Sequence, residues 1–177
     1  MEKQGIYSIY IHDENNRYVL GNKGEKTLYV IGLNPSTATD KKSDRTIDRI
    51  KKDFAKGFDS FIMLNLYPKV TPSPSKLPNN NEYDETAFSR NIAEIGKHVP
   101  ENATILAVWG NNIDCRNYLK TSLLEISKQL NRKNCKWVKI GELTKVGNPR
   151  HPLYARSDWK LSEYKINDKI EKLKQIN

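Results

Sequence analysis

Four short apolar runs alternate with segments of helical periodicity along the chain. The runs cover residues 27–33, 59–66, 103–109 and 136–140, and Gly or Pro follows each of them within two residues. Such runs are typical of buried strands, and strands that alternate with helices indicate a parallel sheet covered on both faces. The pattern therefore predicts a three-layer α/β/α sandwich with a central four-stranded parallel sheet in the order 2-1-3-4.

Helices are expected where apolar residues recur three or four positions apart. These segments are residues 43–56, 82–97, 112–130 and 158–176. Two further β-rich runs, 6–12 and 17–20, flank a polar turn and predict an N-terminal β-hairpin at the edge of the sheet. Residues 67–81 carry several prolines, which predicts a stiff loop that leaves the sheet after the second strand.

Composition indicates the class of protein and the class of partner. The 177 residues are expected to form a single domain, 1–177, and the formal net charge of +9 points to a polyanion, most commonly nucleic acid. Cys115 and Cys135 are isolated, so we expect neither a disulfide nor a metal cluster and favour a reducing cytoplasm. No apolar run approaches a membrane span. We expect a soluble cytoplasmic monomer that needs no cofactor, and the sequence leaves a protein partner open.

Polar side chains follow three of the predicted strands at the same end of the sheet. Asn34 and Ser36 follow the first strand, Asn65 closes the second, and Arg150 and His151 follow the fourth. Ligands of open α/β sheets bind beyond the carboxyl ends of the strands, so these residues are candidates for a binding site. The alternatives are structural, because Asn34 also suits a turn and Asn65 also suits a backbone partner.

Two of these segments resemble the motifs of known families. Residues 33–38 and 147–154 resemble the signature of a family of small uncharacterised bacterial proteins, Leu-Asn-Pro-Ser-Thr-Ala and Gly-x-Pro-Arg-His-Pro-Leu-Tyr. Residues 32–36 are also similar to the Gly-x-Asn-Pro-Gly motif of the uracil-DNA glycosylase superfamily, and residues 149–153 to its His-Pro-Ser motif. Ser36 stands where the first motif has Gly, and Leu153 where the second has Ser.

The resemblance implies a uracil-DNA glycosylase-like domain whose site residues have defined roles. In that superfamily the counterpart of Asn34 positions the hydrolytic water and the counterpart of His151 stabilises the departing base, so both are catalytic candidates. Asn65 resembles the residue that reads the edge of uracil. Tyr67 is the candidate for stacking on the base, and Ser36 completes the set of base-binding candidates.

DNA binding adds a set of basic residues to the expected site. The candidates for phosphate contact are Arg150, Lys145, Arg49 and Lys69, with Lys76 on the same face; Arg49 also suits a solvated helix face. The expected function is DNA binding with hydrolysis of the N-glycosidic bond of uracil or a related damaged base. The alternatives are a non-catalytic nucleic-acid-binding module of the same fold and an enzyme that acts on a free nucleotide or modified base, with Arg49 and Arg150 on its phosphate.

Overall fold

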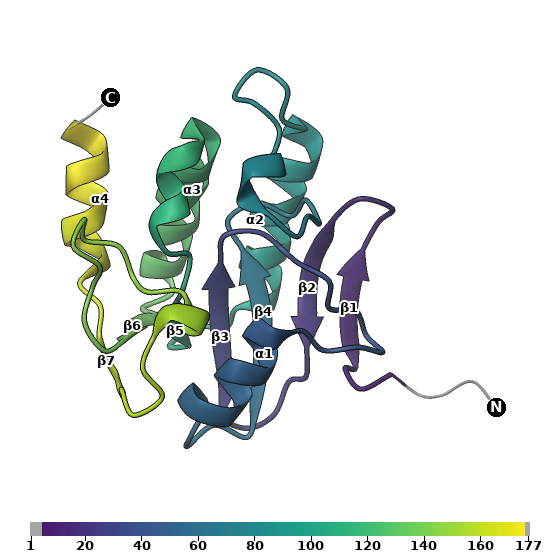
Figure 1. Cartoon of the computed structure of the whole chain (residues 1–177), viewed down its shortest axis with the longest axis vertical. Coiled ribbons are helices and arrows are strands. Elements are labelled where there is room, and N and C mark those ends of the chain that lie inside the picture. The colour runs from purple at the N-terminus through teal and green to yellow at the C-terminus, as the bar shows by residue number, and fades with distance from the viewer. Residues whose placement is uncertain (1–4, 176–177) are drawn as a thin grey trace.

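A seven-stranded mixed sheet runs through the centre of the computed structural model, which describes residues 5–175 (Figure 1). In spatial order the strands are β1 (Ile9–His12), β2 (Arg17–Gly21), β4 (Ser60–Asn65), β3 (Thr27–Gly32), β5 (Thr104–Ala107), β6 (Lys136–Ile140) and β7 (Leu161–Glu163). The inner strands β4, β3, β5 and β6 pair in parallel. The pairs β1–β2, β2–β4 and β6–β7 are antiparallel.

The predicted four-stranded parallel sheet in the order 2-1-3-4 is therefore wrong, because the sheet has more strands and is mixed. The hairpin β1–β2 joins the sheet through β2, which pairs with β4. At the other edge β7 pairs with β6, in a segment where the sequence predicts a helix over residues 158–176. The apolar pattern misses β7 because this edge strand is three residues long and mostly exposed.

The C-terminal helix is shorter than its periodicity predicts. The helix α4 spans Ile166–Gln175, and the last residue of the predicted segment, Ile176, lies outside the described residues. Before the helix, the backbone N–H of Tyr164 donates to the carbonyl of Trp137 at 2.8 Å, which continues the contact between β7 and β6. Tertiary pairing with the sheet here overrides local helical periodicity.

Helices cover both faces of the sheet (Figure 1). On one face lie α2 (Glu85–His98), α3 (Asn117–Arg132) and α4, and on the other lie α1 (Arg45–Arg49) and the π-helical turn η1 (Ile50–Phe54). A hydrophobic cluster lies on each face of the sheet, and alternate residues of β3 belong to one or the other. Tyr29 and Ile31 pack toward α2 and α3, whereas Leu28 and Val30 pack toward α1. This alternation follows from the two-residue period of a strand.

Short 3₁₀ turns shape the loops at the carboxyl ends of the inner strands. These turns are η2 (Pro74–Lys76) after β4, η3 (Asn111–Cys115) after β5 and η4 (Pro152–Tyr154) after β6. The loop after β3 leads into α1, where the carboxylate of Asp44 accepts the backbone N–H of Ile47 and caps the helix. Among the described helices, none combines the length and the apolar character that crossing a bilayer requires.

Candidate functional site

A cavity of about 650 Å³ opens at the carboxyl ends of β3, β4 and β5. Loops that are distant in sequence converge on it, as expected for the binding crevice of an α/β sheet. Its polar lining comes from the β3 loop, the end of β4, the β5 loop, the β6 loop, the start of β2 and the start of α1. The residues that matter below are Asn34, Ser36, Asn65, Gly110, Lys145, Arg150, His151, Arg17, Asp44 and Thr46.

Asn65 is the polar residue at the end of β4, and it is 1% exposed. Neither its Nδ2 nor its Oδ1 has a hydrogen-bond partner among residues 5–175. Gly32 lies beside it on β3, where a Cβ atom would stand 2.9 Å from Asn65 Oδ1, so glycine leaves the space that the amide occupies. A buried amide without partners costs about 1–3 kcal/mol, and this cost is recovered when a ligand supplies a donor and an acceptor.

Side chains from α2 and α3 hydrogen-bond to the backbone at Asn65 and Leu66, in contrast to the Asn65 side chain. Asn91 on α2 donates from Nδ2 to the carbonyl of Asn65 at 2.8 Å. Ser122 on α3 donates from Oγ to the carbonyl of Leu66 at 2.5 Å. Both side chains are fully buried, so they fix the end of β4 and with it the direction of the Asn65 side chain.

Asn34 connects the loop after β3 to the loop after β4. Its Nδ2 donates to the carbonyls of Thr71 at 3.1 Å and Lys69 at 3.4 Å, and Thr71 N–H donates in turn to the carbonyl of Pro35. These bonds assign the amide orientation, because they require the NH₂ group on that side. The Oδ1 of Asn34 is left as the group that accepts from a water or a ligand in the cavity.

His151 is half-buried at the start of η4 and lines the same cavity. Its Nδ1 accepts the backbone N–H of Leu153 at 3.3 Å, so the neutral ring carries its proton on Nε2. Burial lowers the pKa of His151, and the carboxylate of Asp44 opposes this shift. The residue is therefore a neutral hydrogen-bond donor at neutral pH. Gly110, at a backbone conformation of φ +68° and ψ −163°, lies near His151, because a Cβ atom added to it would stand 3.5 Å from the His151 Cβ.

The basic residues that the sequence singles out have different environments. Lys145 is exposed and lines the cavity. Arg150 also lines it, but its guanidinium donates to the carbonyls of Glu142 and Leu143 and stacks over the Trp159 ring at 5.1 Å. Among residues 5–175, the side chain of Lys145 makes no hydrogen bond or ion pair, whereas Arg150 holds the loop together.

Three of the predicted site residues lie outside the lining of the cavity. Tyr67 packs on Tyr83 and Tyr118 in the core beneath α2 and α3, and its hydroxyl accepts the N–H of Asp84. Arg49 pairs with Asp53 at 2.9 Å and donates to the Ala155 carbonyl, which makes it a structural residue. Lys69 contributes its carbonyl to the Asn34 contact. Their positions give no support to roles in base stacking or phosphate contact.

Sequence reasoning missed Arg17 and Asp44, although both line the cavity. Arg17 begins β2 and is only 2% exposed, because β2 is inserted next to β4 and the loop after β3 packs over it. Nothing in the local sequence distinguishes this arginine from a surface residue of a hairpin. Asp44 does carry a signal, since it caps α1, but the cap alone does not show that α1 starts at a cavity.

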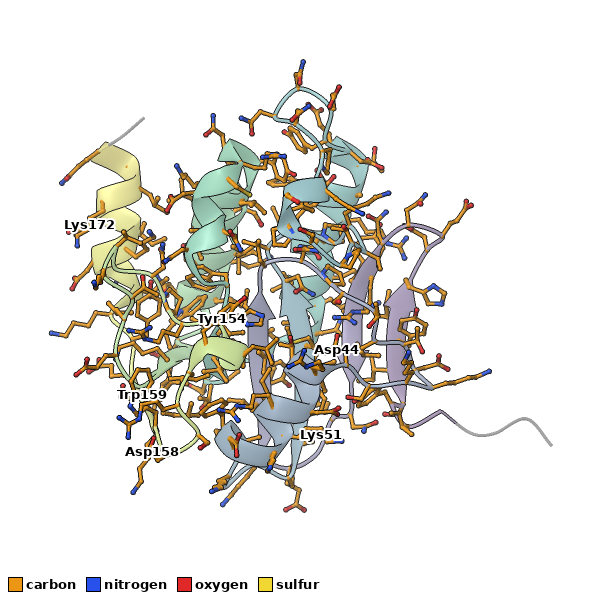
Figure 2. The ribbon with its side chains drawn as sticks, viewed as in Figure 1. Asp44, Lys51, Tyr154, Asp158, Trp159 and Lys172 are labelled. Atoms are coloured by element: carbon orange, nitrogen blue, oxygen red, sulfur yellow. The ribbon has the colours of Figure 1, made fainter. Side chains whose placement is uncertain are left out.

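The rim of the cavity on the η4 side is apolar and open to solvent. Tyr154 is 80% exposed and Leu153 is 40% exposed, and both belong to the cavity lining. Figure 2 labels Tyr154, on η4, and Asp44, at the start of α1, which lie on the same side of the sheet and border the cavity from two different elements. Two exposed apolar side chains thus stand directly beside the cavity on this side.

The described residues include no group of three or more His, Cys, Asp or Glu side chains arranged to hold a metal ion. Comparison with curated proteins and comparison with solved structures each find no match. A family model does match, over residues 17–153, a range that contains β2 to β6 and nearly the whole cavity lining. Because the match covers well over half of the chain, the chain belongs to the family described as Protein of unknown function (DUF1643).

Proposed function

We propose that the cavity binds a nucleobase and that the protein hydrolyses the N-glycosidic bond of uracil or a related damaged base in DNA. The observation that carries the proposal is the Asn65 amide, which is buried in the cavity wall and whose donor and acceptor both lack a partner within residues 5–175. The edge of a nucleobase supplies the complementary acceptor and donor side by side. The resemblance of residues 32–36 and 149–153 to glycosylase motifs supports the reaction.

The lining residues suit the charge changes of this reaction. When the bond between C1′ of the sugar and the base nitrogen breaks, its electron pair moves to the base. The Nε2–H of His151 would donate to a base oxygen as this negative charge grows, because the neutral imidazole keeps its hydrogen on Nε2. Asn34 Oδ1 would hold the water that attacks C1′, and the water then releases its proton to solvent. An amide is a weak base, so stabilisation of the leaving base supplies most of the rate.

The rim of the cavity supports DNA as the carrier of the base. A base within a duplex is inaccessible and must rotate out of the stack before it enters a pocket. The exposed side chains of Leu153 and Tyr154 can pack against the unstacked neighbours, and Lys145 lies near enough to the cavity to meet the backbone phosphates. The free thiols of Cys115 and Cys135 fit the reducing cytoplasm that we also propose as the location.

The direct test measures abasic sites. Single-stranded and duplex oligonucleotides that carry uracil, hypoxanthine or a G·T mismatch are incubated with the protein, and strand cleavage by alkali reports released bases. We expect release from at least one substrate. The variants Asn34→Ala and His151→Ala should lower the rate by about 100-fold or more with a smaller change in affinity, because both residues act mainly in the transition state.

A matched control uses Tyr67, one of the three predicted site residues that lie outside the cavity lining. Tyr67→Phe removes a hydroxyl that contacts Asp84, so base release should be unchanged. Binding of these oligonucleotides without release of any base would contradict the catalytic part of the proposal and would favour a nucleic-acid-binding module. Absence of both binding and release would contradict the proposal as a whole.

A further inference from the structure

Arg17 is a buried cation with too few partners for its charge. Its Nη1 donates to the carbonyl of Ala38 at 2.9 Å, and its Nε has no partner among residues 5–175. None of the ion pairs in this part of the chain involves Arg17. A buried guanidinium without a paired anion is strongly unfavourable, so such residues are rare unless a ligand provides the anion.

Arg17 lies in the wall of the cavity although it is only 2% exposed. The loop after β3 wraps around it, since its partner Ala38 lies two residues after Ser36. Ser36 and Thr46 line the same cavity as Arg17 and bring hydroxyl groups that donate hydrogen bonds. Three donor side chains for an anionic oxygen, one guanidinium and two hydroxyls, are thus available from β2, the β3 loop and the start of α1.

Among the acidic residues, Asp44 has the largest electrostatic effect on Arg17, but within residues 5–175 the two side chains form no ion pair. Burial lowers the pKa of Arg17, whereas the carboxylate of Asp44 opposes the shift from beyond ion-pairing distance. One Asp44 oxygen is already committed to capping α1 through the Ile47 N–H. Arg17 therefore stays charged, and the guanidinium N–H groups that have no partner in residues 5–175 can donate to another acceptor.

We infer that Arg17 is the anchor of a phosphate subsite within the cavity, so that the site takes a phosphorylated nucleotide and not a nucleoside or free base. The inference deepens the proposed function and rests on it for the identity of the base. The phosphate is the one attached to the nucleotide whose base lies against Asn65. It is supplied either by a DNA strand or by a free nucleotide, and the planar fork of Arg17 suits either source.

The first experiment measures the subsite without any base. Inorganic phosphate is titrated into the wild-type protein and the Arg17→Gln and Arg17→Lys variants, with binding followed by calorimetry and by the melting temperature. We expect phosphate to bind and stabilise the wild type, with about 10- to 100-fold weaker binding in Arg17→Gln and an intermediate loss in Arg17→Lys, because hydrogen bonds to charged groups have this strength. Arg132→Gln removes an equal charge from the exposed C-terminal turn of α3, remote from the cavity, and should leave phosphate binding unchanged.

The second experiment adds the base and separates the two sources of phosphate. Affinities are compared for deoxyuridine, its 5′-monophosphate, and a uracil-containing oligonucleotide with either natural or uncharged methylphosphonate linkages around the uracil nucleotide. In the wild type we expect a phosphorylated ligand to bind about 10- to 100-fold more tightly than its uncharged counterpart. The advantage should vanish in Arg17→Gln, while affinity for the uncharged ligand stays. Whichever pair shows the advantage, mononucleotide or oligonucleotide, identifies the source.

The outcomes distinguish failure of the inference from failure of the proposed function. Asn65→Ala should lower the affinity for charged and uncharged ligands equally. If the base makes no difference to affinity in any variant, the base pocket is contradicted but the phosphate subsite is not. Equal affinity of wild type and Arg17→Gln for phosphate and for all nucleotides would overturn the subsite. So would an Arg17→Gln loss that is the same for charged and uncharged ligands. Arg17→Met, which keeps an unbranched stem without charge, replaces Arg17→Gln if that variant fails to fold.

Discussion

Two buried asparagines meet at the end of β4, and they have opposite relations to their neighbours. Asn91 uses its Nδ2 to hold the carbonyl of Asn65, so its side chain stabilises the fold. The Asn65 side chain has no such partner in residues 5–175 and contributes nothing comparable. Hydrogen bonding therefore distinguishes the two amides, because Asn91 is held by the fold and Asn65 has no side-chain partner in the described part of the chain.

The contrast predicts opposite effects of the same substitution. Asn65→Ala removes two buried groups that have no partner within residues 5–175, so the free energy of unfolding should stay within about 1 kcal/mol of wild type or rise. Base affinity should fall by about 1–3 kcal/mol, the value of a bidentate contact with a base edge. Urea unfolding and ligand titration measure the two quantities.

Asn91→Ala is the matched control, and it should lose about 1–3 kcal/mol of stability because it leaves the Asn65 carbonyl buried without its donor. A large loss of stability in Asn65→Ala, comparable to that in Asn91→Ala, would show that Asn65 is a structural residue after all.

His151 gives a prediction for pH. Burial lowers its pKa in the folded protein, so the unfolded chain binds the proton more readily. Stability therefore falls as pH decreases below the unfolded pKa of about 6.5 and stops falling below the lower folded pKa. In His151→Gln this contribution is absent, and the free energy of unfolding should change less between about pH 7.5 and pH 5.5. An identical pH dependence in both proteins would contradict the assignment.

At the scale of the elements, the site depends on how the loops after β5 and β6 fit together. Gly110 N–H donates to the carbonyl of Pro149 at 3.0 Å, and a Cβ atom at Gly110 would stand 3.5 Å from the His151 Cβ. Thr144 and Asn148 both donate to Oδ1 of Asn111, which ties the same two loops a second time. The position of His151 is therefore set by the loop after a different strand.

A glycine substitution tests this dependence. Gly110→Ala forces a side chain into a backbone region that is nearly restricted to glycine, which should cost about 1–3 kcal/mol of stability and move the loop that supports His151. We expect slower base release as well as lower stability. Gly57→Ala is the control, because it has a positive φ of 89° with open space around the added Cβ and lies outside the cavity lining. It should lower stability without an effect on base release; equal activities of the two variants would contradict the role of Gly110.

The elements also show what the sequence can and cannot predict. An amide inside the apolar run of β4 is visible as an anomaly, and it marks Asn65 as a candidate. The sequence names Tyr67 as the stacking candidate, but it does not encode that the strand ends at Asn65 and that the Tyr67 ring then packs on Tyr83 and Tyr118 in the core. β7 is hidden because a three-residue edge strand has no periodicity of its own. The burial of Arg17 arises only when β2 pairs with β4, as in the pair Leu20 and Met63, a contact distant in sequence that local pattern does not encode.

At the scale of the whole molecule, the net charge of +9 is the property that favours DNA as the carrier of the base. Much of this charge is spread over solvent-exposed lysines, so charge alone identifies no surface. The cavity mouth combines Lys145 with exposed apolar side chains, and this combination distinguishes it from a uniformly basic surface. The bound strand is therefore expected to cross the loops after β3 and β6.

Salt titration of single variants tests this placement. Wild-type protein should bind a uracil-containing oligonucleotide at about 50 mM salt, with log K falling linearly against log salt because phosphate contacts release counterions. Lys145→Gln should reduce the steepness of that line by about 0.9 for a duplex or about 0.7 for a single strand, the effect of one lost phosphate contact.

Arg132→Gln removes the same charge from the last turn of α3, next to the amino end of β6 and thus at the other end of the sheet, so its slope should equal that of wild type. Fluorescence anisotropy at several salt concentrations measures all three slopes. Equal slopes for the two variants would place the DNA elsewhere on the protein, and no binding at low salt would remove DNA as the partner, because nine excess positive charges are then insufficient without a matching surface.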